Sequence, residues 1–232
     1  ALAKAVIDNK YELGIGLDGD ADRIGVVDEQ GKMLFGDQIL NILARDYLQK
    51  NPGKKIIADV KCSMNLFNDI KKYGGEPIMY KTGHANIKMF MKEIGVEFAG
   101  EMSGHIFLAD RYLGFDDAIY VSCRFCEIVS QMPNPVSTFL ADQPKLYNTP
   151  ELHTNCPDEK KFELVAKVCE EFKKEGYDVN DIDGARITFP DGWGLIRASN
   201  TTPVIVTRYE AINETRMNEI KNLIEAKIHK YL

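Results

Sequence analysis

Apolar and polar residues alternate in blocks of two lengths along the chain. Short apolar runs bounded by glycine, proline or aspartate are typical of strands, and longer segments with apolar residues at helical spacing are typical of helices. The strands predicted in the first part of the chain are Tyr11–Leu17, Ile24–Asp28, Lys32–Phe35, Lys55–Val60, Glu76–Tyr80, Val96–Ala99 and Ile106–Leu108. The helices predicted there are Ala1–Asn9, Gln38–Gln49 with Asp37 as its cap, Met64–Tyr73, Ala85–Ile94 and Ile119–Met132. Strands that alternate with helices predict an α/β domain with a mixed, partly parallel sheet.

The pattern changes after a cluster of prolines, which marks a domain boundary near residue 145. The elements predicted beyond it are a helix over Pro157–Glu175, strands over Ala185–Phe189, Trp193–Arg197 and Val204–Tyr209, and a helix over Asn213–Leu232. Antiparallel strands flanked by helices predict a small C-terminal α+β domain with an antiparallel sheet.

The beginning of the chain predicts too few elements to bury both faces of a layered domain. A helix end, one strand and a hairpin precede the first long helix, so residues 1–32 look like the C-terminal remnant of a domain whose front is absent. We therefore expect three segments: the remnant 1–32, an α/β domain over 33–144 and an α+β domain over 145–232.

Charge and composition narrow the function classes. The formal net charge is −6 and no Lys/Arg cluster stands out, so we expect no nucleic-acid partner. No apolar run has membrane-spanning length, so we expect no membrane partner. An odd number of scattered cysteines suits a reducing, cytoplasmic setting. Cys123 and Cys126 fall within a helical pattern and are expected to pack as small core residues.

Three carboxylates, Asp18, Asp20 and Asp22, lie between two predicted strands and are followed by Arg23. Packing three acids this closely is costly unless a cation turns repulsion into coordination, and oxygen-only ligands favour Mg²⁺. One alternative is a solvated acidic turn. Another is a calcium-binding loop, with Glu29 at its twelfth position, but Arg23 stands where that loop needs glycine.

The Gly-flanked loop that follows strand Val96–Ala99 carries a carboxylate, a hydroxyl and an imidazole, on Glu101, Ser103 and His105. These groups suit a ligand with many hydroxyls, and His105 is able to transfer a proton. The alternative is a strand-connecting turn with solvated polar residues.

A third loop, between two strands of the last domain, is rich in groups that bind phosphate. Its residues are Arg197, Ser199, Asn200, Thr201 and Thr202. An ordinary Ser/Thr/Asn turn is the alternative. Lys61 and His84 follow two neighbouring strands and are expected at the same edge of the sheet, where ligands of open α/β sheets gather. The alternative for Lys61 is a solvated lysine, and the alternative for His84 is a polar residue at a helix N-terminus.

The order and residue types of these loops resemble the α-D-phosphohexomutase family, most closely bacterial phosphomannomutase/phosphoglucomutase. The acidic loop resembles the family's magnesium site, Glu101 to His105 its sugar-recognition loop in domain 3, and Arg197 to Thr202 the substrate-phosphate loop of domain 4. The resemblance covers nearly the whole chain. One departure is that family members carry a phosphoserine in a Ser-His motif of domain 1, and no serine of this chain is followed by histidine.

The resemblance implies an intramolecular phosphotransferase, classed as an isomerase of carbohydrate metabolism. The intact enzyme would interconvert hexose 1-phosphate and hexose 6-phosphate through a phosphoserine and a bisphosphate intermediate. Glucose 1,6-bisphosphate or mannose 1,6-bisphosphate would be activator and intermediate, and Mg²⁺ would bind Asp18, Asp20 and Asp22. The implied catalytic residues are Arg23, Lys61 and His105, with Lys61 or His105 as general acid/base. The implied substrate-binding residues are His84, Glu101, Ser103, Arg197, Ser199, Asn200, Thr201 and Thr202.

Two other functions compete with this one. Without the phosphoserine domain, the chain alone is expected to be inactive, and the N-terminal half of the same protein is an expected partner. A non-catalytic sugar-phosphate-binding module is therefore the main alternative. An aspartyl phosphatase shares the spaced aspartates but needs Thr or Val where Asp22 stands.

Overall fold

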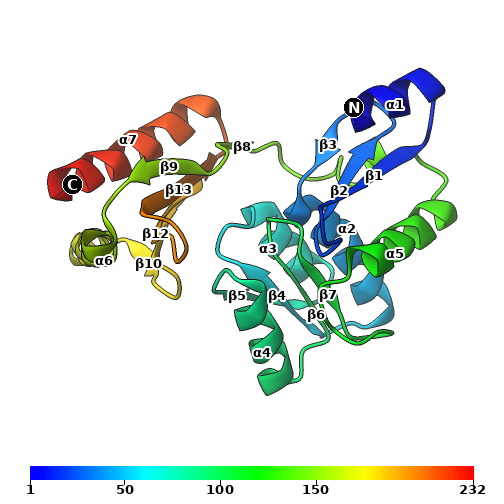
Figure 1. Ribbon diagram of the computed structural model, residues 1–232, viewed down its shortest axis with the longest axis horizontal. Coiled ribbons are helices and arrows are strands. Elements are labelled where there is room, and N and C mark those ends of the chain that lie inside the picture. Colours follow the sequence, from blue (N-terminus) through cyan, green and yellow to red (C-terminus); the bar gives the residue numbers. More distant parts are fainter. The chain divides into compact units, whose positions relative to one another are not determined.

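The computed structural model describes residues 1–232, which divide into two compact units, Ala1–Gln143 and Pro144–Leu232 (Figure 1). Each unit has its own apolar core. None of the helices is both long and apolar enough to cross a membrane.

The first unit begins with helix α1 (Leu2–Asn9) and a small antiparallel sheet. The sheet contains β1 (Leu13–Leu17), β2 (Ile24–Asp28) and β3 (Met33–Leu34) in that order. Side chains of β2 and β3 belong to the same core as the long helix that follows, because Ile24, Val26 and Leu34 pack with its buried face. The acidic loop connects β1 to β2 and is therefore anchored on a packed hairpin.

An α/β layer makes up the rest of the first unit (Figure 1). Its helices are α2 (Gly36–Lys50), α3 (Met64–Lys72), α4 (His84–Ile94) and α5 (Ala118–Gln131), with a 3₁₀ turn at Val136–Thr138. Its strands are β4 (Lys55–Asp59), β5 (Glu76–Tyr80), β6 (Phe98–Gly100) and β7 (Ile106–Leu108). The sheet order is β5-β4-β6-β7, with β4 parallel to both neighbours and β7 antiparallel. One core lies against α2, α3 and α5, and a second core on the other face involves α4.

The strand order creates a switch point at β4. The chain passes from β4 to β5 on one side and then returns to β6 on the other side of β4. The connections that leave β4 and β6 therefore diverge, and in open α/β sheets ligands bind beyond the carboxyl ends of the strands at such a point. Lys61 follows β4, and the loop from Glu101 to His105 follows β6.

The second unit is an antiparallel sheet covered by two helices. Its strands are β8 (Tyr147–Asn148), β9 (Leu152–Asn155), β10 (Asp178–Asn180), β11 (Ala185–Phe189), β12 (Gly192–Ala198) and β13 (Val204–Ala211). The order is β10-β11-β12-β13-β8, and β9 also pairs with β13. Buried residues of α6 (Asp158–Lys174) and α7 (Glu214–Tyr231) form its core with the sheet. The predicted fold class is confirmed in both units.

Two local predictions were wrong. Asp37 lies inside α2 rather than at its cap, and its Oδ2 accepts the N–H of Ser63 at 2.9 Å. Cys123 and Cys126 are exposed rather than packed in the core. The buried stripe of α5 runs through Ala118, Val121, Phe125 and Ile128, which leaves both cysteines outside it.

Candidate functional site

The acidic loop is folded around the side chain of Asp18. Its Oδ1 accepts the backbone N–H groups of Asp22 and Arg23, each at 3.2 Å. Ala21 adopts a positive φ of 60°, which turns the chain back toward β2. One carboxylate oxygen from each of Asp18, Asp20 and Asp22 lies within 4.8 Å of the others. A convergent set of carboxylate oxygens fits a hard divalent cation such as Mg²⁺.

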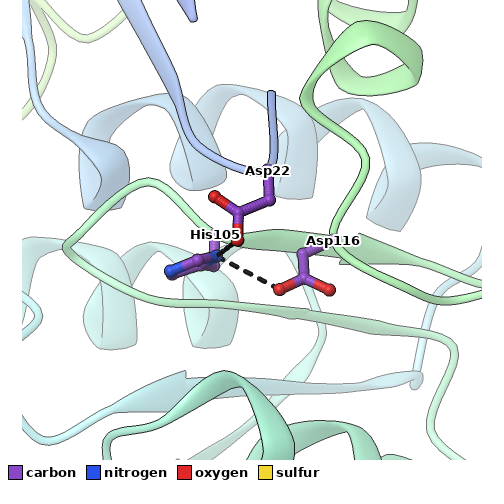
Figure 2. A group of neighbouring side chains, drawn as sticks. All are labelled: Asp22, His105 and Asp116. Atoms are coloured by element: carbon purple, nitrogen blue, oxygen red, sulfur yellow. Dashed lines mark ion pairs between the residues drawn. The ribbon is translucent and has the colours of Figure 1, made fainter. Parts of the chain in front are cut away.

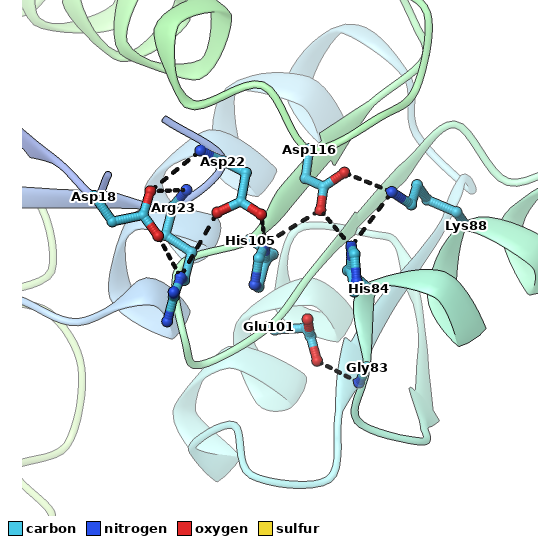
Figure 3. Close-up of polar contacts among 9 residues, drawn as sticks. All are labelled: Asp18, Asp22, Arg23, Gly83, His84, Lys88, Glu101, His105 and Asp116. Atoms are coloured by element: carbon cyan, nitrogen blue, oxygen red, sulfur yellow. Dashed lines mark hydrogen bonds and ion pairs between the residues drawn. The ribbon is translucent and has the colours of Figure 1, made fainter. Parts of the chain in front are cut away.

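Arg23 is the internal counter-ion of this loop (Figure 3). Its Nε lies 2.6 Å from Asp18 Oδ2 and 3.7 Å from Asp22 Oδ1. Burial alone would raise the pKa of Asp18, but hydrogen bonds from the backbone and side chain of Arg23 outweigh it and hold the pKa below its usual range. Asp18 is thus ionised and oriented at neutral pH, as a metal ligand must be.

Backbone hydrogen bonds join the acidic loop to two other segments. The N–H of Ile24 donates to the carbonyl of Gly104 at 3.2 Å, and the N–H of Ala118 donates to the carbonyl of Ala21 at 3.0 Å. Helix α2 approaches from another side, because a Cβ on Gly36 would lie 2.6 Å from backbone atoms of Glu101, Met102 and Gly104. The acidic loop and the Glu101–His105 loop are therefore held in one fixed arrangement.

Glu101 is buried, with 2% of its surface exposed. Its Oε1 accepts the N–H of Gly83 at 2.6 Å, immediately before α4 begins (Figure 3). Burial, assisted by the negative charge of Asp59, raises the pKa of Glu101 to about 7. The carboxyl group therefore has both a donor and an acceptor form near neutral pH, which suits the recognition of hydroxyl groups.

The two histidines of the site meet at Asp116, a residue that the sequence analysis did not single out (Figure 3). Asp116 Oδ2 lies 3.0 Å from His84 Nδ1 and 3.2 Å from His105 Nδ1, and its Oδ1 accepts from Lys88 Nζ at 2.7 Å. The sequence feature that could have identified Asp116 is the pair of adjacent aspartates, Asp116 and Asp117, before α5. Only Asp117 caps α5, through the N–H of Tyr120, so the other carboxylate was left for a different role.

His105 also lies next to the acidic loop, with its Nδ1 3.6 Å from Asp22 Oδ2 (Figure 2). Its burial lowers the pKa and outweighs the opposite effect of Asp22 and Asp116. Asp22, His105 and Asp116 also have ligand atoms within 4.8 Å of one another. This second cluster includes an imidazole nitrogen, whereas the acidic loop offers oxygen ligands only, so the acidic loop is the better match for a hard cation such as Mg²⁺.

Lys61 and Ser103 complete the predicted residues of the first unit. Lys61 is buried, with its Nζ 3.9 Å from Asp59 Oδ2, whereas Ser103 is exposed. The structure thus brings six predicted groups to the carboxyl edge of the sheet and to the adjoining hairpin loop, from four separate segments. These groups are the acidic loop, Lys61, His84, Glu101, Ser103 and His105.

The third predicted loop connects β12 to β13 in the second unit. Arg197 is buried, and its guanidinium is oriented by Asp183 through contacts of 3.2 and 3.4 Å. Ser199 shapes the loop, because its Oγ accepts the N–H groups of Thr201 and Thr202. The buried ammonium of Lys161, from α6, donates to the carbonyl of Thr202 at 2.9 Å.

Asn200, Thr201 and Thr202 are exposed at this loop, whereas Arg197 is buried. Because Ser199 Oγ is committed to backbone N–H groups and to Thr202 Oγ1 at 2.8 Å, it preorganises the loop. Sequence reasoning assigned Ser199 a direct contact but missed Asp183 and Lys161, whose distance along the chain hides their role.

Comparisons with known proteins find similar domains over most of the chain. Residues 35–147 match the model of phosphoglucomutase/phosphomannomutase, alpha/beta/alpha domain III, and residues 151–227 match the C-terminal domain of phosphoglucomutase/phosphomannomutase. A phosphomannomutase/phosphoglucomutase of Pseudomonas syringae pv. tomato is 42% identical over 229 residues, which is 99% of this chain and 49% of the relative. The chain thus spans about half the length of the curated relatives it matches.

Solved structures give the same result. A phosphoglucomutase/phosphomannomutase family protein from Burkholderia thailandensis superposes with a TM-score of 0.90 at 39% identity, covering 99% of this chain and 49% of that one. An N-acetylphosphoglucosamine mutase of Aspergillus fumigatus, solved in complex with GlcNAc-6P and magnesium, shares the fold at 15% identity with a TM-score of 0.67. It covers 94% of this chain and 48% of that one.

Proposed function

Because the chain belongs to the phosphoglucomutase/phosphomannomutase family, of which it carries domain III and the C-terminal domain, we propose that it is part of an enzyme that interconverts hexose 1-phosphate and hexose 6-phosphate. The observation that carries the proposal is the backbone bond between Ile24 and Gly104. This hydrogen bond holds the acidic loop beside the Glu101–His105 loop, and a cation site next to groups for sugar hydroxyls is what the transfer of a phosphoryl group to and from a sugar requires.

Asp18, Asp20 and Asp22 would hold Mg²⁺ in the intact enzyme. A bound divalent cation neutralises charge on a phosphoryl group in transfer. Arg23, which contacts two of these carboxylates, would orient the oxygens of the same phosphoryl group. Their spacing and the pKa of Asp18 support this assignment.

Glu101, Ser103 and His84 would bind sugar hydroxyls at the carboxyl edge of the sheet. Arg197, Asn200, Thr201 and Thr202 would bind the phosphate that is not in transfer, and Ser199 would preorganise their loop. A guanidinium held by Asp183 presents its remaining N–H groups in a fixed direction, which favours recognition of phosphate.

Two residues compete for the role of general acid/base. His105 lies beside the acidic loop at Asp22, next to the position where a metal would meet the transferring group. The ammonium of Lys61 instead faces Asp59. Position therefore favours His105, with Lys61 as a fixed positive charge for the sugar or its phosphate.

The test is binding of glucose 1-phosphate and mannose 1-phosphate to this chain, measured by calorimetry in the presence of Mg²⁺. We expect Glu101→Ala to weaken the binding of both sugar phosphates strongly. Lys92→Ala, on the solvent side of α4 in the same unit, is the control and should leave both affinities unchanged. Equal binding by wild type and Glu101→Ala would contradict the proposed function.

A non-catalytic sugar-phosphate-binding module is the second candidate. It is favoured by one observation, the lack of any Ser-His dipeptide in the sequence to carry the phosphoryl group. We expect this chain alone to show no mutase turnover in a coupled assay for glucose 6-phosphate, even with Mg²⁺ and glucose 1,6-bisphosphate. Addition of the N-terminal half with a phosphorylated serine would restore activity to an enzyme but not to a binding module. Turnover by the chain alone would require a different phosphoryl carrier.

A further inference from the structure

A fully buried carboxylate lies beneath the loops of the first unit. Asp59 is the last residue of β4 and has 0% of its surface exposed. Its Oδ1 accepts from the backbone N–H of Met102 at 3.1 Å and from the thiol of Cys62 at 3.0 Å. Its Oδ2 accepts from the hydroxyl of Thr82 at 3.1 Å. One side chain thus contacts the segments that follow β4, β5 and β6.

The strand order explains why this position has such reach. β4 lies between β5 and β6, and Asp59 pairs with Tyr80 at the end of β5. Ala58, one residue earlier, pairs with Gly100 at the end of β6. A side chain at the end of β4 is therefore the central point among three loops that carry proposed ligand residues, namely Lys61, His84 and Glu101.

We propose that Asp59 is the positioning residue of the sugar-binding loops: it sets the mutual placement of the segments after β4, β5 and β6. The inference rests on the proposed function in that the ligand is taken to be a hexose phosphate. Asp59 contacts no ligand itself and acts through Met102, Thr82 and Glu101.

Geometry supports the proposal. A buried carboxylate is stable only where its oxygens are hydrogen-bonded, and Asp59 achieves this with donors from all three segments. Movement of any one segment would remove a hydrogen bond from a buried charge. The three segments are therefore coupled through Asp59 and are expected to move together or not at all.

The negative charge of Asp59 also acts on Glu101, whose Oε1 accepts the N–H of Gly83 at 2.6 Å. Burial is the main reason why the pKa of Glu101 is raised to about 7, and the charge of Asp59 acts in the same direction. Three groups act in the opposite direction: the N–H of Gly83, the ammonium of Lys61 and the imidazole of His84. A carboxyl group that is partly protonated near neutral pH both donates to and accepts from a sugar hydroxyl.

The test compares Asp59→Asn with Asp69→Asn in the full chain. Asparagine at 59 keeps the size and one acceptor but removes the charge. Asp69 is the matched control because it is also a buried aspartate of the first unit, where it lies on α3 and pairs with Arg45 of α2. The measurements are the titration of the Glu101 carboxyl carbon by NMR, the amide shifts of residues 101–105 and the affinity for glucose 1-phosphate.

We expect Asp59→Asn to lower the pKa of Glu101 and to change the chemical shift of the Met102 amide most. The affinity for glucose 1-phosphate should fall by about tenfold. Asp69→Asn should change none of these quantities. A folded Asp59→Asn protein with unchanged amide shifts at residues 101–105 and unchanged affinity for glucose 1-phosphate would overturn the proposal. If wild type fails to bind glucose 1-phosphate, the proposed function fails, and the amide shifts still decide the role of Asp59.

A second variant covers the case in which Asp59→Asn does not fold. Thr82→Val removes one donor to Asp59 and leaves its charge and its bond to Met102 in place. We expect a several-fold loss of affinity and amide shifts on both sides of Asp59, at Gly83 and at Met102. Shifts confined to residues 81–84 would show that the segments are not coupled, and this would overturn the proposal.

Discussion

Gly104 accepts a backbone hydrogen bond from Ile24, and through this contact the acidic loop and the Glu101–His105 loop become parts of one site. Gly104 has a φ of +101°, and a Cβ at this position would lie 2.7 Å from the carbonyl oxygen of Ile24. Both the backbone conformation and the close approach therefore require glycine.

Gly104→Ala is expected to lower the free energy of unfolding by about 1–3 kcal/mol. The affinities for Mg²⁺ and for glucose 1-phosphate should both fall, because the strain separates the two loops. Chemical denaturation and calorimetry would measure these effects. Gly19→Ala is the matched control, since its Cβ would meet nothing within 4 Å. Loss of sugar binding with unchanged Mg²⁺ affinity would show that the loops act separately.

Asp20→Asn is expected to abolish Mg²⁺ binding with little change in stability. Asp20 is the exposed one of the three aspartates, so its charge is available to a cation and its side chain contributes little to packing. Calorimetry with Mg²⁺ or Mn²⁺ should show one site in wild type and in the control Asp8→Asn, whose carboxylate pairs with Lys4 on α1. Equal binding by Asp20→Asn and wild type would exclude the acidic loop as the metal site.

Arg197→Ala is expected to weaken binding of glucose 1-phosphate or mannose 6-phosphate by about 1.5–3 kcal/mol, the usual contribution of charged hydrogen bonds, and to leave free glucose unaffected. The affinity would be measured by NMR titration, from the amide chemical shifts of the second unit. Arg216→Ala removes a surface arginine of the same unit, paired with Asp191, and should bind phosphate like wild type. If both variants bind alike, the anion lies elsewhere.

Stability of the first unit is expected to depend on pH through Glu101. Because burial raises its pKa from 4.5 to about 7, the folded state holds a proton that the unfolded state has lost between these values. The stability that the protonated Glu101 contributes to the folded state is therefore fully present below about pH 4.5 and is lost as the pH rises through 7. Glu101→Gln should remove this dependence, so its stability relative to wild type should rise by about 2–3 kcal/mol between pH 5 and 8.

Urea denaturation at several pH values would measure the effect. Glu97→Gln is a control of opposite sign, because the hydroxyl of Tyr47 and the ammonium of Lys54 lower the pKa of Glu97. Its wild-type contribution is present above the unfolded pKa and lost in acid, so this variant should lose relative stability as pH rises from 3 to 5. Parallel profiles for Glu101→Gln and wild type would mean that Glu101 is not protonated at neutral pH.

The sequence by itself determined the fold class, most of the helices and strands, and the three polar loops. These features are local, because hydrophobic period and turn residues act over a few positions of the chain. The acidic loop illustrates this: Asp18, Asp20 and Asp22 are two residues apart, so the bend that brings them together is encoded in their own segment. The short strands β8 to β10 escaped prediction because pairing with β11 and β13, rather than their own pattern, defines them.

Only the tertiary structure decided which distant groups complete the site. Asp116 is brought to both histidines by the packing of α5 beside the hairpin, and Asp59 reaches three loops because β4 lies between β5 and β6 in its sheet. Lys161 reaches Thr202 in the same way, from a different element. These contacts depend on strand order and on the burial of charge, which act over long chain separations and leave no periodic signal in the sequence.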